Sequence, residues 1–532
     1  MADIKIALAQ MEVIPGMPKK NLETMLVMIG DAKKNKTDLI VFPEMCVGGY
    51  LISDKWLDED FCLDLMSYNQ DILKASDGIA IAYGNIFVDN EINKRIGEDK
   101  KHPNKDGRSR KYNAVYVVQN GKFARKLRET KTLPEGIQAK TLLPNYRFFD
   151  DERYFFSTQD IAQDFNVTLE ELLSPFVIEI RGKEVPIGFE LCEDLWCEDY
   201  RRNNRALNPT KTLIDNGAQY IVNISASPWT FGKNSSRDRR IKFLKQESGD
   251  DFVPFFYVNC TGAQNNGKNI VTFDGGSTVY NVDGLPVVLS KRAYEQELIF
   301  VEDSDLGKKV SKRIEKSSIT QKYDAIIRGI RHVKDINGQE SQPLYVIGLS
   351  GGIDSAVVAA LLTKAVGKER VLGINMPSRY NSSKTKNAAA KVAERLEIGY
   401  ETIPIDEISE LNRKLIDGID PARDGKKLSV SNMENVQAKI RGAGMLSNIA
   451  AKYNALFTNN GNKLEIALGY STLYGDLGGA IAPIGDLTKT EVVEMALYLN
   501  EEIFGKEIIP QEVIPDKLWR FSAFKRAKGK DK

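Results

Sequence analysis

The residues best suited to chemistry form a short glycine- and serine-rich loop in the second half of the chain. An apolar run of strand length, residues 344–349, is followed by Ser-Gly-Gly-Ile-Asp-Ser at positions 350–355 and then by good helix formers. Glycine lets backbone N–H groups approach a ligand closely, and the start of a helix favours an anion such as phosphate. Asp354 is a poor partner for bare phosphate, so a divalent cation between the two is the natural explanation. The sequence therefore predicts a phosphate-binding loop between a strand and a helix.

Two better-known nucleotide-binding loops do not fit these residues. A P-loop needs a lysine directly after its last glycine, and residues 348–355 contain no lysine. The dinucleotide fingerprint needs Gly-x-Gly-x-x-Gly, and Gly348, Gly351 and Gly352 have other spacings. An ordinary strand-to-helix turn that happens to be rich in glycine and serine is the simplest alternative.

The order Ser-Gly-Gly-x-Asp-Ser resembles the pyrophosphate loop of the ATP pyrophosphatases. Those enzymes activate a carboxyl or carbonyl oxygen as an adenylate, from which a nitrogen or sulfur nucleophile then displaces AMP. The resemblance implies that ATP is bound by the whole loop, namely Gly348, Leu349, Ser350, Gly351, Gly352, Ile353, Asp354 and Ser355.

Polar residues also follow apolar runs in the first half of the chain. Glu44 comes soon after the run 38–42, and Cys192 ends the run 185–191 and is followed by two carboxylates. Ligand-binding groups of α/β sheets lie at the carboxyl ends of strands, so both residues are well placed, although a surface glutamate explains Glu44 equally well. Carboxylates beside a thiol disfavour its thiolate, so a reactive cysteine here needs a cation nearby.

Three motifs, taken together and in this order, resemble the nitrilase superfamily of carbon–nitrogen hydrolases. They are Phe-Pro-Glu44, Lys140-x-x-Leu-Pro, and Cys192-Glu193-Asp194 before Trp196. Each motif is weak by itself, and Lys140 alone reads as a solvated lysine, but the three in register are specific. The resemblance covers roughly residues 3–300. It implies an α-β-β-α sandwich in which Glu44, Lys140 and Cys192 are the catalytic residues.

Composition excludes several classes of protein. The net charge is +1, from 74 basic and 73 acidic residues, which argues against general binding to nucleic acid or to a membrane surface. No apolar stretch approaches the roughly 20 residues of a membrane span, and the first residues show no signal-peptide pattern. The five cysteines form no C-x-x-C pair, so we expect a reduced, cytoplasmic protein. The only histidines, His102 and His332, lack the neighbours of a zinc site or a histidine-based triad.

We expect an α/β protein with two domains. A nitrilase-like glutamine amidohydrolase domain is predicted at residues 1–302, a charged linker at 303–321, and an ATP pyrophosphatase domain at 322–532. In the second domain, apolar runs at 370–376 and 400–405 alternate with helical segments. This alternation predicts a doubly wound parallel sheet.

Four further segments resemble the NAD synthetases, and with the nitrilase-like half they resemble the glutamine-dependent members of that family. They are residues 434–442, 460–465, 469–479 and 483–491. The resemblance implies ATP-dependent amidation of deamido-NAD to NAD, with ammonia taken from glutamine and release of AMP and pyrophosphate. It also implies a homo-oligomer, commonly an octamer.

The same resemblance implies roles for individual residues. They are glutamine binding by Tyr146, Ser227 and Lys233, ATP binding by Asn460, deamido-NAD binding by Asn435, Glu465 and Lys525, and Mg²⁺ binding by Asp354 and Glu465. Asn460 stands where the family usually has a threonine. The family's Phe-Asp-Glu after the triad lysine reads Phe-Asp-Asp here, at positions 149–151. After Pro510 the chain also lacks the family's usual longer loop, and only Phe524-Lys525-Arg526 resembles its basic terminal motif.

Two other functions compete with this interpretation. One is a different amidotransferase with the same ATP loop, such as a GMP or asparagine synthetase, but those enzymes carry other glutaminase domains. The other is a non-catalytic sensor that binds glutamine and ATP through degenerate sites, against which the intact Glu44, Lys140 and Cys192 set argues.

Overall fold

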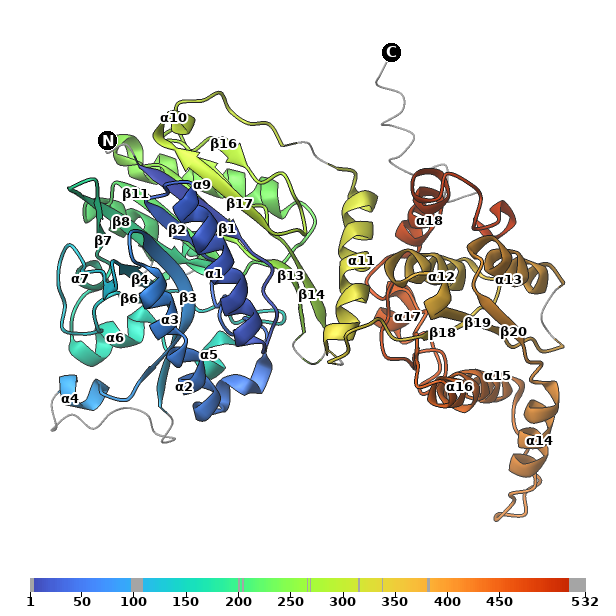
Figure 1. Ribbon diagram of the computed structural model, residues 1–532. Helices are drawn as coiled ribbons and strands as arrows, with labels where there is room; N and C mark the ends of the chain where they lie inside the picture. The colour runs from blue at the N-terminus through green and yellow to red at the C-terminus, as the bar shows by residue number, and fades with distance from the viewer. Residues whose placement is uncertain are drawn as a thin grey trace. The chain divides into compact units, whose positions relative to one another are not determined.

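The computed structural model describes residues 4–96, 109–199, 201–202, 205–265, 267, 269–313, 316–336, 338–379 and 383–515. The chain divides into two compact units, Met1–Glu315 and Lys316–Lys532 (Figure 1). Each unit has its own sheets and its own buried apolar core, so each is described separately.

The first unit contains two large β-sheets. One has the strand order β17-β1-β2-β3-β4-β5, with β6 paired to β4. Its strands are β1 (Lys5–Gln10), β2 (Leu39–Val41), β3 (Ala80–Asp89), β4 (Arg110–Gln119), β5 (Lys122–Phe123), β6 (Ile137–Ala139) and β17 (Glu297–Glu302). The other has the order β16-β15-β12-β11-β8-β7. It comprises β7 (Phe176–Ile180), β8 (Lys183–Leu191), β11 (Tyr220–Ser225), β12 (Phe255–Asn259), β15 (Thr278–Tyr280) and β16 (Pro286–Leu289).

The two sheets pack face to face, and helices cover their outer faces. In β1, Ile6 and Leu8 belong to the core between the sheets, whereas Ala7 and Ala9 belong to the core under the helices, as the period-two alternation of a strand requires. The first sheet is covered by α1 (Pro18–Lys34), α2 (Glu59–Ser67) and α3 (Asn69–Ala75), and the second by α8 (Pro209–Asp215) and α9 (Lys233–Ser248). The predicted α-β-β-α sandwich is confirmed.

The second unit is built on a four-stranded parallel sheet in the order β20-β19-β18-β21. Its strands are β18 (Tyr345–Gly348), β19 (Val371–Asn375), β20 (Gly399–Thr402) and β21 (Leu456–Phe457). In Figure 1, α12 (Ile353–Val366) and α13 (Ser383–Leu396) lie on one side of this sheet, and α15 (Val430–Lys439) and α16 (Ser447–Lys452) lie on the other. Helices on both faces of a parallel sheet make the doubly wound arrangement, and this prediction is also confirmed.

Helical structure occupies part of the stretch predicted as a linker. α10 (Asp303–Leu306) lies at its start, and α11 begins at Ser318 and continues to Ile336. Buried apolar residues at helical spacing, among them Ile319, Ile327 and Ile330, explain why the helix begins this early. Between the helices, Arg313 is anchored to the first unit by bonds of 2.8 and 2.9 Å to the carboxylate of Asp238. None of the described helices is both long enough and apolar enough to cross a membrane.

Candidate active sites

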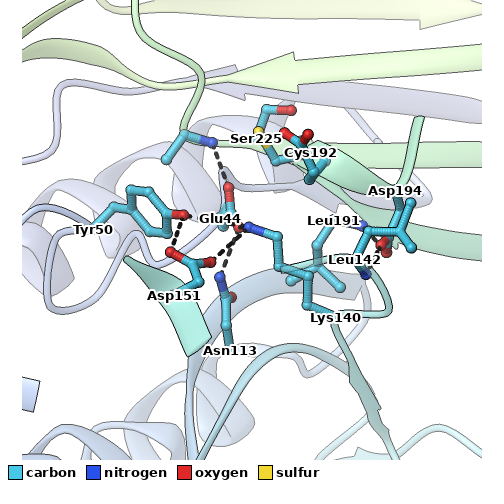
Figure 2. A network of polar contacts seen from close by, with 12 residues as sticks. Glu44, Tyr50, Asn113, Lys140, Leu142, Asp151, Leu191, Cys192, Asp194 and Ser225 are labelled. Carbon is cyan, nitrogen blue, oxygen red and sulfur yellow. Dashed lines mark hydrogen bonds and ion pairs between the residues drawn. The ribbon is translucent and has the colours of Figure 1, made fainter. Parts of the chain in front are cut away.

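The three residues predicted to be catalytic follow three strands of the sandwich. Glu44 comes shortly after β2, Lys140 directly follows β6, and Cys192 directly follows β8. Because β2 and β6 belong to one sheet and β8 to the other, the residues meet where the two sheets face each other. Figure 2 shows their side chains converging on one place.

Glu44 is held by three hydrogen-bond donors. Its Oε1 accepts from Lys140 Nζ at 2.8 Å and from Asn113 Nδ2 at 2.7 Å, and its Oε2 accepts from the backbone N–H of Ala226 at 2.9 Å. The side chains of Glu44 and Lys140 are both fully buried. A buried ion pair is tolerated when further hydrogen bonds satisfy its remaining atoms, and here they also fix the carboxylate in one orientation.

Lys140 contacts a second carboxylate. Its Nζ lies 3.2 Å from Asp151 Oδ2, and Asp151 Oδ1 accepts from the Tyr50 hydroxyl at 2.6 Å. Burial lowers the pKa of Lys140, but the carboxylates of Asp151 and Glu44 outweigh burial and hold this pKa well above its ordinary range. Lys140 is therefore a cation throughout the physiological pH range.

Cys192 occupies a strained backbone position. Its φ of +36° lies in the left-handed region, which is uncommon for any residue other than glycine and is often found at functional sites. Burial and Glu44 raise the pKa of Cys192 to about 12, although Lys140 and Lys233 act to lower it. A thiol with this pKa needs a base close by before it can act as a nucleophile, and Glu44 is the carboxylate predicted for that role.

Two of the three residues predicted to bind glutamine gather beside the thiol. The Tyr146 hydroxyl donates to Glu193 Oε2 at 3.0 Å. Lys233 begins α9, where burial lowers the pKa of its ammonium and the nearby Cys192 opposes this effect. An anion and a cation placed together here suit the ammonium and carboxylate groups of an amino acid.

Ser227, the third of these residues, lies two residues beyond β11 and is buried. Its backbone N–H donates to Asn259 Oδ1 at 2.8 Å, and its carbonyl accepts from Asn259 Nδ2 at 2.9 Å. Both bonds use backbone atoms, so they fix the chain beside Ala226, whose N–H contacts Glu44.

The sequence analysis gave no role to four side chains of this site, namely Tyr50, Asn113, Asp151 and Glu193, although it quoted Asp151 and Glu193 within motifs. Asn113 is fully buried in β4, directly before the apolar run 114–118, and its position beside that run was the available signal. Tyr50 and Asp151 are separated by 101 residues, so no local pattern connects them.

Gly84 in β3 leaves room for the backbone at Glu44. A Cβ at this position would lie 2.3 Å from Met45 N and 2.6 Å from Glu44 Cα. We expect Gly84→Ala to displace Glu44 and lower kcat for glutamine hydrolysis by about 10²-fold, the usual cost of a misplacement near 1 Å. The measurement is ammonia release from glutamine.

A matched control for this variant is Gly30→Ala. Gly30 lies in α1, and nothing stands within 4 Å of a Cβ added there. We expect this variant to keep the rate of the unsubstituted protein, because alanine is the better helix former. An unchanged rate in Gly84→Ala would show that the close approach of β3 does not position Glu44.

In the second unit, the predicted loop joins β18 to α12 and is braced by its own serines. The hydroxyl oxygens of Ser350 and Ser355 lie 3.1 Å apart, the Gly352 N–H donates to Ser350 Oγ at 3.2 Å, and Ser355 Oγ donates to the Gly352 carbonyl at 3.0 Å. Gly351 has a φ of +82°, which favours glycine at this position. The loop is therefore fixed at the start of a long helix, where an anion is favoured.

The two carboxylates predicted to bind magnesium both contact Asn462. Asn462 Nδ2 donates to Asp354 Oδ1 at 3.0 Å, and the Asn462 backbone N–H donates to Glu465 Oε2 at 2.9 Å. Asp354 is also paired with the ammonium of Lys489, at the start of α18 (Lys489–Tyr498). Among the described residues, no group of three or more histidine, cysteine or acidic side chains is arranged to hold a metal ion.

The remaining predicted contacts are placed as follows. Asn460 Nδ2 donates to the Gly348 carbonyl at 3.0 Å, and its Oδ1 accepts from Thr458 Oγ1 at 2.9 Å, so this amide is engaged at the base of the loop. Asn435, on α15, accepts from Thr472 Oγ1 at 2.7 Å. Lys525 lies outside the described residues.

Fold and site together define a nitrilase-type amidohydrolase unit that shares one chain with an ATP pyrophosphatase unit. Comparison with known proteins agrees: the family model of carbon-nitrogen hydrolases matches residues 5–302, and that of NAD synthases matches residues 325–517. The glutamine-dependent NAD(+) synthetases of Synechocystis sp. and Thermotoga maritima are 31% and 30% identical, over 96% of this chain in each case and 82% and 83% of theirs.

A solved structure of such an enzyme is also similar. The glutamine-dependent NAD+ synthetase from Acinetobacter baumannii, in complex with ADP, gives a TM-score of 0.77 at 26% identity, covering 99% of this chain and 86% of that chain. The present chain therefore belongs to the glutamine-dependent NAD(+) synthetase family.

Proposed function

We propose that this chain makes NAD by amidating deamido-NAD, with nitrogen taken from glutamine and with ATP converted to AMP and pyrophosphate. The observation that carries the proposal is the fully buried Glu44–Lys140 pair, 2.8 Å apart, beside the Cys192 thiol. The same polypeptide holds the braced Ser350–Ser355 loop, which suits a nucleotide pyrophosphate. A nitrogen-releasing site and an acid-activating site in one chain are what glutamine-driven amidation requires.

In the first unit, the described residues support a thioester mechanism. Glu44 accepts the proton of the Cys192 thiol as Sγ attacks the carboxamide carbon of glutamine. The Lys140 ammonium stabilises the negative oxygen that develops. Glu44 then returns the proton to the leaving nitrogen, and ammonia departs. Water hydrolyses the resulting glutamyl thioester, with Glu44 again taking a proton, and this releases glutamate and the free thiol.

Glutamine is held for this attack by groups around the thiol. Lys233 and Tyr146, with Glu193 beside Tyr146, are positioned to bind the charged backbone end of the amino acid. Ser227 is buried and follows Ala226, whose N–H contacts Glu44, and this supports a role for it on the Glu44 side of the bound glutamine. These roles explain selectivity for an amino acid over a simple amide.

In the second unit, the loop positions ATP. The β- and γ-phosphates are held by the N–H groups of Gly351, Ile353 and Asp354 and by the serine hydroxyls, while the N–H groups of Ser350 and Gly352 brace the loop itself. The Asn460 amide supports the loop through the Gly348 carbonyl. The nicotinate carboxylate of deamido-NAD, held in part by Asn435, then attacks the α-phosphorus, and pyrophosphate leaves. Ammonia displaces AMP from this adenylate and forms the amide of NAD. Positioning and neutralisation of charge supply most of the acceleration.

Asp354 and Glu465 are the carboxylates that would hold a magnesium ion. The Lys489 ammonium already pairs with Asp354, and Asn462 contacts both carboxylates, one through its side chain and the other through its backbone N–H. One or two carboxylates with phosphate oxygens are the usual ligands of protein-bound Mg²⁺. Bound there, the ion would neutralise phosphate charge. We further propose that the enzyme is a cytoplasmic homo-oligomer, as its family resemblance implies.

The proposal is tested by incubating the full chain with glutamine, deamido-NAD and MgATP and measuring NAD, AMP and pyrophosphate. We expect one NAD for each AMP formed. ADP and phosphate in place of AMP and pyrophosphate would contradict the assignment of the loop. Turnover with xanthylate or aspartate in place of deamido-NAD would identify a different amidotransferase, and binding without any turnover would identify a sensor.

A further inference from the structure

Asp194 connects the two chain segments that carry Lys140 and Cys192. Its Oδ1 accepts from the backbone N–H of Leu142 at 2.8 Å and of Thr141 at 3.1 Å, and its Oδ2 accepts from the backbone N–H of Leu191 at 3.1 Å. Thr141 and Leu142 directly follow Lys140, whereas Leu191 directly precedes Cys192. Figure 2 shows Asp194 beside the backbone of Leu142 and Leu191. One carboxylate thus bridges the two sheets next to the candidate active site.

We propose that Asp194 is a positioning residue that fixes the Lys140 ammonium relative to the Cys192 thiol. The inference rests on the proposed glutaminase function, because it assigns Asp194 a role in that reaction. Asp194 itself does not touch the reacting atoms; it acts through the backbone on either side of the two side chains that do.

Two observations make this bridge more than ordinary packing. First, the backbone of Lys140 is fixed on its own side of the sandwich: its N–H donates to the Asn113 carbonyl of β4 at 2.9 Å, and its carbonyl accepts from the N–H of Thr158, at the start of a helix, at 2.9 Å. Cys192 belongs to the end of the second sheet and has left-handed backbone. The separation of the two side chains therefore depends on connections between the sheets. The bond from the Ala226 N–H to Glu44 is one of them, and Asp194 makes another directly beside Lys140 and Cys192.

Second, both side-chain oxygens of Asp194 act as acceptors. Burial and Glu190 raise the pKa of Asp194 well above its ordinary range, and the N–H groups of Leu191 and Leu142 oppose this by favouring the carboxylate. Asp194 is 1% exposed, and within the described part of the chain its hydrogen-bond partners are all N–H donors. An asparagine would offer one acceptor oxygen and one NH₂ group. The NH₂ group would face either the N–H groups of Thr141 and Leu142 or the N–H of Leu191. Either orientation releases one of the two segments while leaving the size of the side chain unchanged.

The test is therefore Asp194→Asn in the full chain. We expect kcat for glutamine hydrolysis to fall by about 10²-fold with little change in KM, because within the described residues Asp194 bonds to the backbone of Thr141, Leu142 and Leu191 and not to Tyr146 or Lys233. Rates are expressed per reactive site, counted by covalent labelling with the diazoketone analogue of glutamine. This normalisation separates a misplaced site from a smaller folded fraction, and ammonia-driven NAD synthesis provides a second check of folding.

A second readout distinguishes positioning from a purely structural role. If Lys140 moves away from the thiol, the cation that favours the thiolate is weakened, so the pH at which Cys192 reacts half-maximally with iodoacetamide should rise. Peptide mass spectrometry assigns the alkylation to Cys192. A variant that is merely less stable would keep the pH profile of the unsubstituted protein.

The matched control is Glu190→Gln. Glu190 is as buried as Asp194, but its Oε1 accepts from Asn223 Nδ2 at 2.9 Å and its Oε2 accepts from Thr210 Oγ1 at 2.7 Å. Glutamine can keep both contacts, because the threonine hydroxyl can accept a hydrogen bond instead of donating one. Glu190, after burial, is the main group that raises the pKa of Asp194, so this variant reports the effect of losing a neighbouring carboxylate without breaking the bridge.

The outcomes separate the inference from the proposed function. The inference is supported if Asp194→Asn has a lower kcat and a higher pH of half-maximal Cys192 alkylation, while Glu190→Gln has near-normal values of both. The inference is overturned if Asp194→Asn has a normal kcat and a normal alkylation profile, or if both variants lose kcat equally. If Asp194→Asn gives no reactive sites, Asp194→Glu, which moves both oxygens by one methylene, is measured in the same way, and a normal kcat would overturn the inference. A lack of glutaminase activity in the unsubstituted chain would instead count against the proposed function.

Discussion

Replacing Cys192 with alanine should abolish NAD synthesis from glutamine and leave synthesis from free ammonia close to the normal rate. The thiol is the nucleophile of the proposed first half-reaction, and removing a nucleophile of this kind costs on the order of 10⁶-fold in kcat. The second unit does not use the thiol, since its loop and carboxylates come from residues 348–355 and 460–465. The measurement compares NAD formation with glutamine and with ammonium chloride at a pH where free ammonia is present.

The control for this variant is Cys62→Ala. Cys62 is also fully buried, but it lies in α2 and its Sγ contacts the Trp56 carbonyl rather than the candidate site. We expect it to keep both activities, with only the modest loss of stability that a small cavity causes. If Cys192→Ala retained glutaminase activity, the nucleophile would have to be sought elsewhere.

Replacing Asp354 with asparagine should give the opposite pattern. The amide can keep the contact with Asn462 but lacks the charge that is paired with Lys489 and that would hold magnesium. We expect NAD synthesis from glutamine and from ammonia to fall by about 10²- to 10³-fold, the usual effect of removing one electrostatic group from a transition-state site. Glutamine hydrolysis measured without nucleotide should persist, and both activities are followed in the same preparation.

Asp324→Asn serves as the comparison for this variant. Asp324 lies in α11 and is paired with Lys316 at 2.8 Å, in a partly exposed position of the same unit. An exposed ion pair contributes about 0–1 kcal/mol, so this variant should behave as the unsubstituted protein does. Equal losses in the two variants would remove the special role assigned to Asp354.

The sequence predicted the candidate sites best where the chemistry lies in consecutive residues. The Ser350–Ser355 loop contains both its glycines and the serines that brace them, so its strand-loop-helix setting was evident. Cys192 stood out because it ends an apolar strand instead of lying inside one. The two sheets of the sandwich were predicted by the resemblance to the nitrilase superfamily, and in the structure residues such as Ile6 and Ala7 face opposite cores.

Contacts that arise only from folding were beyond sequence reasoning. Asn113 reaches Glu44 across 69 residues, and Asp194 reaches Leu142 across 52. The sequence showed Asp194 only as a charge beside a thiol, whereas the structure turns it toward backbone N–H groups of another sheet. Asn460 was predicted to contact ATP by family resemblance, and its bond to the Gly348 carbonyl depends on the parallel pairing of β18 with β21.

The three donors on Glu44 have a consequence for the speed of each catalytic cycle. A carboxylate in water must shed and reorient solvent before it can accept a proton, whereas this one already has its dipolar surroundings in place. The reorganisation is completed once, when the chain folds, and does not recur at each turnover. The proposed base is thus already oriented before any amide binds.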